Sequence, residues 1–305
     1  MKKKSGQFNF GWLFAIIVGG AILFFAIYGA MKTGDTQRYQ SDTQVARSIS
    51  ILTDPLQAGF SQGSYGSIHF REITRINNLC YDNGFGRNDL SVSTRSDIGQ
   101  EWNMPGSEAS VHNKYIFSPE NIQGKDFYVF SKPLELPYKI ADLVFLISDN
   151  YCFTEAPEDI VSELSAFNIP NIQINNCTLP NQTKVCFVYK TGCDILVNTN
   201  DGKIIKKQEE LYFQGRALMY AGIFSDKRNY ICNTKRLLYR GQTIAEELIK
   251  KSDIMSSRGC QSSLKQDLVS WKLTLNNTSP DNLADLHNQL VEIENKNEKE
   301  QCSLW

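Results

Sequence analysis

A long apolar run at residues 10–31 dominates the hydrophobic pattern of the chain, and a basic segment at residues 2–4 precedes it. At about 1.5 Å per residue, a helix over this run is ~33 Å long, which matches the ~30 Å hydrocarbon core of a lipid bilayer. The flank after the run is less basic, a bias that places the N-terminus in the cytoplasm. We therefore expect residues 1–9 to form a cytoplasmic basic leader and residues 10–31 to form a transmembrane helix in the lipid bilayer.

The helical pattern extends beyond this run. Residues 36–52 contain neither Gly nor Pro, and Pro55 ends the segment. We expect residues 32–55 to form a helical stalk. Together with the apolar run it makes one continuous or broken helix from Phe10 to Thr53, in which Gly29 and Gly34 permit kinks. The residues that recur there at mostly helical spacing are Tyr39, Ala46, Ile49 and Leu52.

Residues 56–207 have a different residue pattern: short runs rich in Val, Ile, Phe and Thr are separated by Gly, Asn and Pro. Such runs are typical of strands, and we expect a β-rich extracytoplasmic domain here. A short helix is predicted at residues 158–167, because Pro157 suits a helix start and Pro170 follows its end. The predicted strands are 67–76, 90–94, 127–130, 143–147, 172–174, 184–189, 195–197 and 203–205.

Residues 208–305 return to a helical period and are predicted to be an α-rich C-terminal region. Arg236 lies off the apolar face of the first helix there, and Ser279-Pro280 opens the second. The apolar stripes are Leu237, Gly241, Ile244, Leu248 and Met255, then Leu283, Leu286, Leu290 and Ile293. The predicted fold is therefore α+β: an N-terminal transmembrane helix continuing into a stalk, a β-rich extracytoplasmic body and a helical C-terminal region.

Charge and histidine content exclude two classes of function. The formal net charge is -1 over 305 residues, so the chain has no basic field to hold nucleic acid. The histidines His69, His112 and His287 are scattered, and no Cys-x-x-Cys pair occurs. We therefore predict no metal site and no cofactor.

All eight cysteines follow the apolar run, in the part predicted to be exported. An even number in an oxidising compartment indicates disulfides. Cys186 and Cys193 flank a predicted hairpin turn and form our first predicted pair, and Cys260 with Cys302 is the second. The pairing of the others stays open: Cys80, Cys152, Cys177 and Cys232.

Acceptor triplets for N-glycosylation agree with export. They begin at Asn176 and Asn181, and Asn276 and Asn277 offer overlapping acceptors. These four asparagines are possible glycosylation sites.

Small residues of the apolar run fall in one sector of the helix, about 100° wide. They are Gly11, Ala15, Gly19, Ala26 and Ala30. Small faces let helices approach closely in lipid, which makes this sector a candidate surface for packing against a second copy or another envelope protein. The alternative is that Gly and Ala are simply common in membrane helices.

The N-terminus resembles the leader of type IV pilins and archaellins. Basic residues precede Gly6-Gln7, and a long hydrophobic helix then enters the predicted exported domain. The resemblance implies cleavage between Gly6 and Gln7 and packing of the helices into a filament core. Two positions depart from the pattern: Ser5 stands where a basic residue is usual, and Gly11 where pilins generally have Glu.

A wider likeness covers most of the chain. The segments that carry it are Gly6-Gln7, Gly11-Trp12, and residues 93–96, 128–133, 221–226 and 232–237. Together they resemble a group of archaeal single-pass membrane-anchored surface proteins. The likeness implies an archaeal cell-surface protein and carries no activity with it.

Three short motifs match elements of penicillin-binding proteins and class A β-lactamases. They are Ser-Asp-Asn at 148–150, Lys-Thr-Gly at 190–192 and Ser-x-x-Lys at 262–265. Their order is wrong, because those families place the nucleophile motif first. We therefore predict no catalytic residues, and an envelope serine acyl-enzyme is the third hypothesis.

The sequence favours a membrane-anchored extracytoplasmic structural or adhesive protein of the cell envelope. It is expected to be single-pass, with a cytoplasmic N-terminus and partners that are further copies or other envelope proteins. The alternative is a minor pilin-like or secretion-system component.

Overall fold

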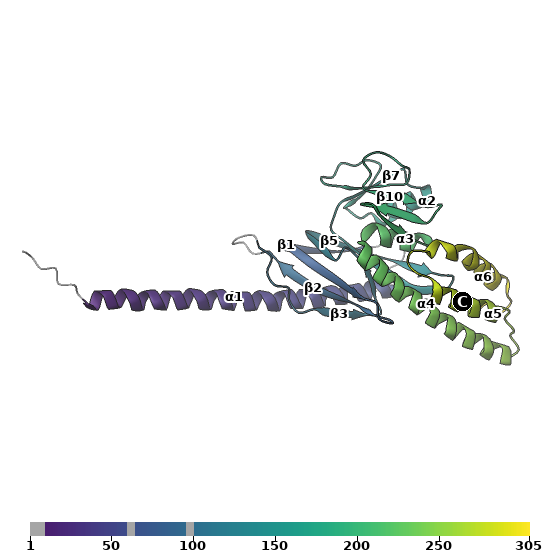
Figure 1. Cartoon of the computed structure of the whole chain (residues 1–305), viewed down its shortest axis with the longest axis horizontal. Helices are drawn as coiled ribbons and strands as arrows, with labels where there is room; N and C mark the ends of the chain where they lie inside the picture. The colour runs from purple at the N-terminus through teal and green to yellow at the C-terminus, as the bar shows by residue number, and fades with distance from the viewer. Residues whose placement is uncertain (1–9, 60–64, 96–100) are drawn as a thin grey trace, which may run out of the picture.

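The structure is a computed structural model that describes residues 10–59, 65–95 and 101–305. Within its first helix, it describes the side chains of residues 14–29, 32, 39–40, 42–46 and 49. The α+β class is confirmed, because the described residues form two six-stranded sheets and several helices. Figure 1 shows the long helix α1 (Phe10–Gly59) projecting from a body that contains both sheets.

The first sheet, which we call the central sheet, has the strand order β3-β2-β1-β5-β6-β4. Its strands pair antiparallel except for β4 and β6, which run parallel. Gly84 and Gly86 form the turn between β1 and β2 with φ of 62° and 55°, values that glycine adopts without strain. The strands are β1 (Tyr65–Tyr81), β2 (Arg87–Thr94), β3 (Ala109–His112), β4 (Tyr115–Phe117), β5 (Asn121–Glu135) and β6 (Lys139–Ile147).

The second sheet, which we call the outer sheet, has the order β12-β11-β10-β9-β7-β8. It is parallel from β8 to β10 and antiparallel from β10 to β12. Helix α2 (Glu158–Phe167) connects β7 to β8, over the residues predicted for it. The strands are β7 (Tyr151–Thr154), β8 (Ile172–Ile174), β9 (Thr183–Cys186), β10 (Ile195–Asn198), β11 (Lys203–Lys206) and β12 (Glu209–Tyr212).

The C-terminal part of the chain is helical, as predicted. Its elements are α3 (Gly215–Phe224), α4 (Lys227–Ser257), α5 (Lys265–Asn277), the 3-10 helix η1 (Leu283–Leu286) and α6 (His287–Lys299). Asp226 caps α4 by accepting a hydrogen bond from the backbone N–H of Asn229 at 2.8 Å. The sequence analysis missed α3 and α5 and began the last helix at Ser279-Pro280, before its observed start.

The central sheet is apolar on both faces. Along β6, Val144 and Leu146 join one buried cluster, whereas Leu143, Phe145 and Ile147 join another. Side chains alternate across a strand, so such a continuous apolar run requires a cover on each face.

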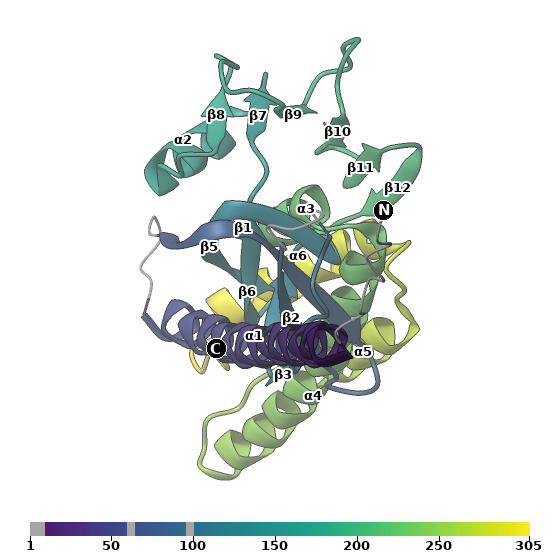
Figure 2. The ribbon, with the colours of Figure 1, turned by 90° about the vertical axis from the view of Figure 1, so that its left-hand side faces the viewer.

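The C-terminal half of α1 covers the first face. Ala46 and Ile49 are fully buried there against a cluster that includes Ile76, Leu90 and Val92. Figure 2 shows α1 lying along the central sheet, on the side away from the outer sheet. The segment predicted as a stalk is thus helical, and part of it also packs against the body.

Helix α1 runs through Pro55 to Gly59, so the prediction that the helix ends at Pro55 is wrong. A proline removes one backbone hydrogen bond to the preceding turn, and near the end of a helix this loss is small. Within the described part of the chain, no helix combines the length and the apolar content needed to cross a membrane.

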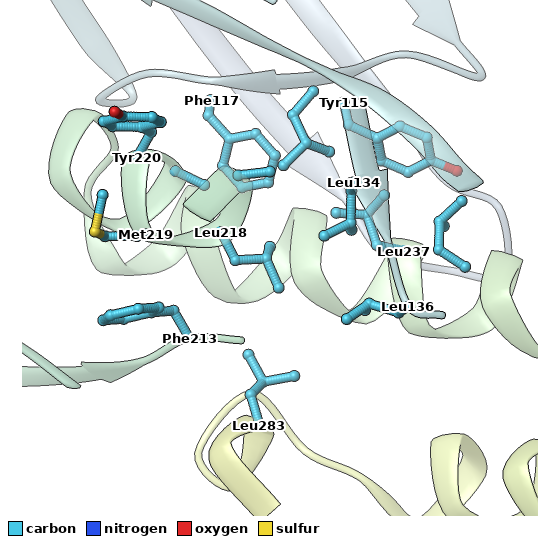
Figure 3. Close-up of a cluster of buried hydrophobic side chains, with 14 of the residues drawn as sticks. Tyr115, Phe117, Leu134, Leu136, Phe213, Leu218, Met219, Tyr220, Leu237 and Leu283 are labelled. Atoms are coloured by element: carbon cyan, nitrogen blue, oxygen red, sulfur yellow. The ribbon is translucent and has the colours of Figure 1, made fainter. Parts of the chain in front are cut away.

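Helices α3 and α4 and the outer sheet cover the second face. Figure 3 shows Phe117 of β4 close to Leu218 and Tyr220 of α3, and Tyr115 of β4 on the side of Leu237 of α4. These residues belong to one cluster that also includes side chains of the outer sheet, α5 and α6. The β-rich part and the helical C-terminal part therefore share a core.

Four disulfides pair all eight cysteines. The two predicted pairs, Cys186–Cys193 and Cys260–Cys302, are both present. Cys80–Cys232 joins the end of β1 to α4, and Cys152–Cys177 joins β7 to the segment after β8. The first of these closes the longest loop and holds α4 against the central sheet.

Arg236 is fully buried, so the prediction that it lies on a polar face of α4 is wrong. Its guanidinium donates hydrogen bonds to the backbone oxygens of Phe85 (2.8 Å) and Lys114 (3.0 Å). It also donates to the side-chain oxygens of Asn88 (2.6 Å) and Asn233 (2.7 Å). A buried charge is tolerated where its donors are satisfied, and here the acceptors tie α4 to the edge of the central sheet.

Replacing Gly106 with alanine should loosen the contact between α1 and the central sheet. A Cβ at Gly106 would lie 2.6 Å from the backbone nitrogen of Thr43, so α1 or the loop must shift. We expect Gly106→Ala to lower the free energy of unfolding by about 1–3 kcal/mol, measured by urea denaturation. Gly66→Ala is the control, because its nearest contact would be 3.9 Å away; equal stability of the two variants would contradict the packing described.

Candidate functional site

The N-terminal half of α1 exposes a continuous apolar surface. Residues 14–29 contain no charged side chain, and large apolar side chains lie around the whole helix. Their exposed fractions run from 37% at Val18 to 69% at Phe25. A helix that is apolar all round is stable in apolar surroundings, so this half of α1 is a candidate contact surface. The exposed residues are Phe14, Ile16, Ile17, Val18, Ile22, Leu23, Phe24, Phe25, Ile27 and Tyr28.

The predicted small-residue face is exposed where the structure describes it. Ala15, Gly19 and Ala26 are all exposed, and no atom lies within 4 Å of a Cβ built at Gly19. Gly11 and Ala30 lie in α1, but their surroundings fall outside the described side chains. The predicted cleavage position, Gly6 and Gln7, lies outside the described residues.

Polar contacts fix the other half of α1 on the body. Thr43 accepts a hydrogen bond from the backbone N–H of Ser107 at 2.8 Å, and the hydroxyl groups of Tyr39 and Ser107 are 2.8 Å apart. Asp42 is buried against β2, where the Thr94 hydroxyl donates to its carboxylate at 3.4 Å. The direction in which the apolar half of α1 projects is therefore set by the folded body.

A second candidate site is a cleft of about 840 Å³ beside the outer sheet, which we call the outer cleft. Its walls come from the start of β7 and of β10, the end of β11 and the loop after β9. Residues distant in the sequence thus meet there. They are Pro119, Asp149, Tyr151, Thr183, residues 189–196, residues 205–208 and Asp226.

Lys206, at the end of β11, is the most constrained polar side chain of the outer cleft. Its ammonium donates hydrogen bonds to the backbone oxygens of Ile223 and Ser225, both at 2.8 Å. Burial lowers the pKa of Lys206 to about 8, although Asp226 acts in the opposite direction. The ammonium is thereby held beside the C-terminal end of α3.

The rim of the outer cleft is a loop closed by the disulfide Cys186–Cys193. At its tip, Tyr189 is 82% exposed, and Val188 next to it is 55% exposed. Lys190 lies 3.5 Å from the carboxylate of Glu155. A loop this short has little freedom once it is closed covalently, so it presents an aromatic ring in a limited set of positions.

Two of the three enzyme-like motifs meet at the outer cleft. Asp149 and residues 190–192 line it, whereas Ser262 and Lys265 do not. Lys265 instead pairs with Asp253 at 2.6 Å, beyond the end of the β-rich part. Among the described residues, no cluster of His, Cys, Asp and Glu could hold a metal ion.

The predicted glycosylation positions are exposed. Asn176 and Asn181 lie in the loop between β8 and β9, and Asn276 and Asn277 lie at the end of α5. The sequence analysis did not single out Lys206, Tyr151 or the role of Asp226. No local signal could have found them, because the sheet order brings them together.

Comparison of the chain with protein-family models, curated proteins and solved structures gave no match.

The lowered pKa of Lys206 should appear in the pH dependence of stability. Its pKa is about 8 in the folded protein and close to 10.5 in the unfolded chain, so the unfolded chain binds more protons between these values. Stability from this group therefore rises as the pH rises from 8 to 10.5, and Lys206→Met should remove the rise in urea titrations.

Lys203→Met is the control for this titration. The hydrogen bond to Glu210 raises the pKa of Lys203, so its contribution changes above this pH window. A rise of equal size in wild type and Lys206→Met would contradict the environment described for Lys206.

Proposed function

We propose that the protein is a structural or adhesive protein of the cell envelope, anchored in the lipid bilayer by α1 and carrying its body outside the cytoplasm. The observation that carries this proposal is the division of α1 into two halves. One half is packed into the body through Ala46 and Ile49, and the other exposes apolar side chains on every side.

The energetics of the exposed half support an apolar environment. Removing the exposed parts of its large apolar side chains from water is favourable by on the order of 10 kcal/mol in total. The predicted span, residues 10–31, extends at both ends beyond the described side chains of residues 14–29. At a length of about 33 Å, it suits the thickness of a bilayer core.

The disulfides support an oxidising location for the body. All eight cysteines are paired, and none lies in the segment before residue 80. Disulfides persist outside the reducing cytoplasm, so the body and the leader are assigned to opposite sides of the membrane. The accessible acceptors Asn176, Asn181, Asn276 and Asn277 agree with this orientation.

The second candidate function is a minor pilin-like or secretion-system component. It is favoured by the uninterrupted course of α1 from Phe10 to Gly59, with its C-terminal half packed on a sheet. A helix of this kind can place its apolar half in a bundle of identical helices after cleavage between Gly6 and Gln7. The two candidate functions differ in what surrounds the apolar half of α1: a lipid bilayer in the first, and further copies of the protein in the second.

Membrane extraction tests the anchor. We expect the protein to stay in membranes after washing with alkaline carbonate and to be released by detergent. The double variant Ile17→Asp and Phe24→Asp should be released by carbonate, because each charge costs several kcal/mol in hydrocarbon.

The control pair replaces two exposed apolar residues of the body, Ile73→Asp and Ile254→Asp, and should remain membrane-bound. Release of the wild-type protein by carbonate would refute the anchor. The mass of the N-terminus then separates the two functions: a start at Met1 favours a permanent anchor, and a start at Gln7 favours the pilin-like component.

Self-association through the small-residue face has its own test. Ala15→Leu with Gly19→Leu should reduce cross-linking of the protein in native membranes several-fold, because leucine keeps the helices apart. Gly20→Leu with Ala21→Leu makes the same change in composition on the opposite side of α1 and should leave cross-linking intact. Equal cross-linking of both double variants would remove this face as the packing surface.

A further inference from the structure

The outer cleft combines an exposed aromatic ring with a balanced set of polar groups. Tyr189 projects from the disulfide-closed rim, and Tyr151 lies in the wall below it. The polar wall residues include Thr183, Thr191 and Gln208. The formal charges of the lining cancel, because it holds three lysines and three aspartates: Lys190, Lys206, Lys207, Asp149, Asp194 and Asp226. This set is unsuited to a strongly charged ligand and offers donors and acceptors in similar number.

We propose that the outer cleft binds a neutral saccharide. The hydroxyl groups of a sugar each donate and accept hydrogen bonds, which matches a lining that contains both donor and acceptor side chains. The C–H face of a pyranose ring is apolar and flat, and it can stack on the exposed ring of Tyr189. At about 840 Å³, the outer cleft has room for a few sugar units.

Fixed polar groups in the outer cleft support this assignment. Lys206 uses two of its three N–H bonds on the carbonyl oxygens of Ile223 and Ser225, which leaves one donor for a ligand. Asp149 also lines the cleft, where burial raises the pKa of its carboxyl group and the nearby Lys206 and Lys207 act in the opposite direction. Asp194 accepts a hydrogen bond from the backbone N–H of Lys184 at 2.8 Å, so its position is also set. Prearranged partners reduce the entropy that a flexible polar ligand loses on binding.

A role of the outer cleft in adhesion to a glycan-bearing surface rests on the proposed function of the protein. Binding of a saccharide in the outer cleft is independent of that function. The test therefore uses the full chain in a detergent without a sugar headgroup, so that membrane retention plays no part in the result. The probe is a panel of neutral mono- and disaccharides of glucose, galactose, mannose and N-acetylglucosamine. Binding is read from saturation-transfer NMR and from the dissociation constant obtained by titration.

We expect at least one neutral sugar of the panel to bind, and Tyr189→Ala to weaken its binding tenfold or more. Tyr189→Trp keeps a flat ring and should restore binding, while Gln208→Ala should weaken it several-fold. The control, Tyr81→Ala, removes an exposed tyrosine of β1 outside the outer cleft and should bind like the wild type. All these positions are exposed, so the variants are expected to fold, and circular dichroism checks that they do.

The proposal is overturned if no sugar of the panel binds the wild-type protein, or if Tyr189→Ala binds as tightly as the wild type. It is also overturned if sulfated or carboxylated glycans bind and neutral sugars do not, because charge would then control recognition. If the protein is released from membranes by carbonate but still binds a sugar, the membrane anchor is refuted and the assignment of the outer cleft as a saccharide site stands.

Discussion

The two apolar faces of the central sheet are the constraint on which the rest of the structure depends. In β6, successive residues from Leu143 to Ile147 are buried on alternate faces, so neither face can be left to water. Helices α3 and α4 cover one face and the C-terminal half of α1 covers the other. The N-terminal helix is therefore a core element of the body, and its orientation is not free.

This constraint explains why α1 has one half packed on the body and one half that projects from it. Because residues 42–49 are held by the central sheet and by Ser107, residues 14–29 must leave the body along the same axis. Figure 1 shows this part of α1 projecting from the body, and its large apolar side chains are exposed. Figure 2 shows the outer sheet lying away from α1, and strands of the outer sheet line the outer cleft. The proposed anchor and the proposed saccharide site are therefore on separate parts of the molecule.

Local patterns predicted the elements whose side chains have one clear period or boundary. The bounds of α2 and β8 agree with the sequence, and the disulfide predicted between Cys186 and Cys193 is present. The hairpin turn predicted between these two cysteines is wrong, because β9 and β10 run parallel. Helix α3 was missed because most of its residues are buried, which removes the amphipathic period. Arg236 was misplaced because a charged residue is normally solvated, and only the tertiary structure supplies its carbonyl acceptors.

The outer cleft was beyond prediction for a related reason. Its residues come from β7, the loop after β9, the turn after β11 and the start of α4, and they meet only through the order of the outer sheet and the packing of α4 beside it. Residues of the motifs at 148–150 and 190–192 line the outer cleft. The resemblance of these motifs to a serine enzyme did not predict the cleft, because the serine of the third motif, Ser262, lies outside it.

Hydrogen–deuterium exchange of the full chain in lipid nanodiscs separates the two halves of α1 by their surroundings. We expect strong protection of the amides of residues 14–29, by the bilayer, and of residues 42–49, by the central sheet. Rapid exchange at residues 14–29 with protection retained at residues 42–49 would contradict the claim that the projecting half of α1 is held in an apolar environment.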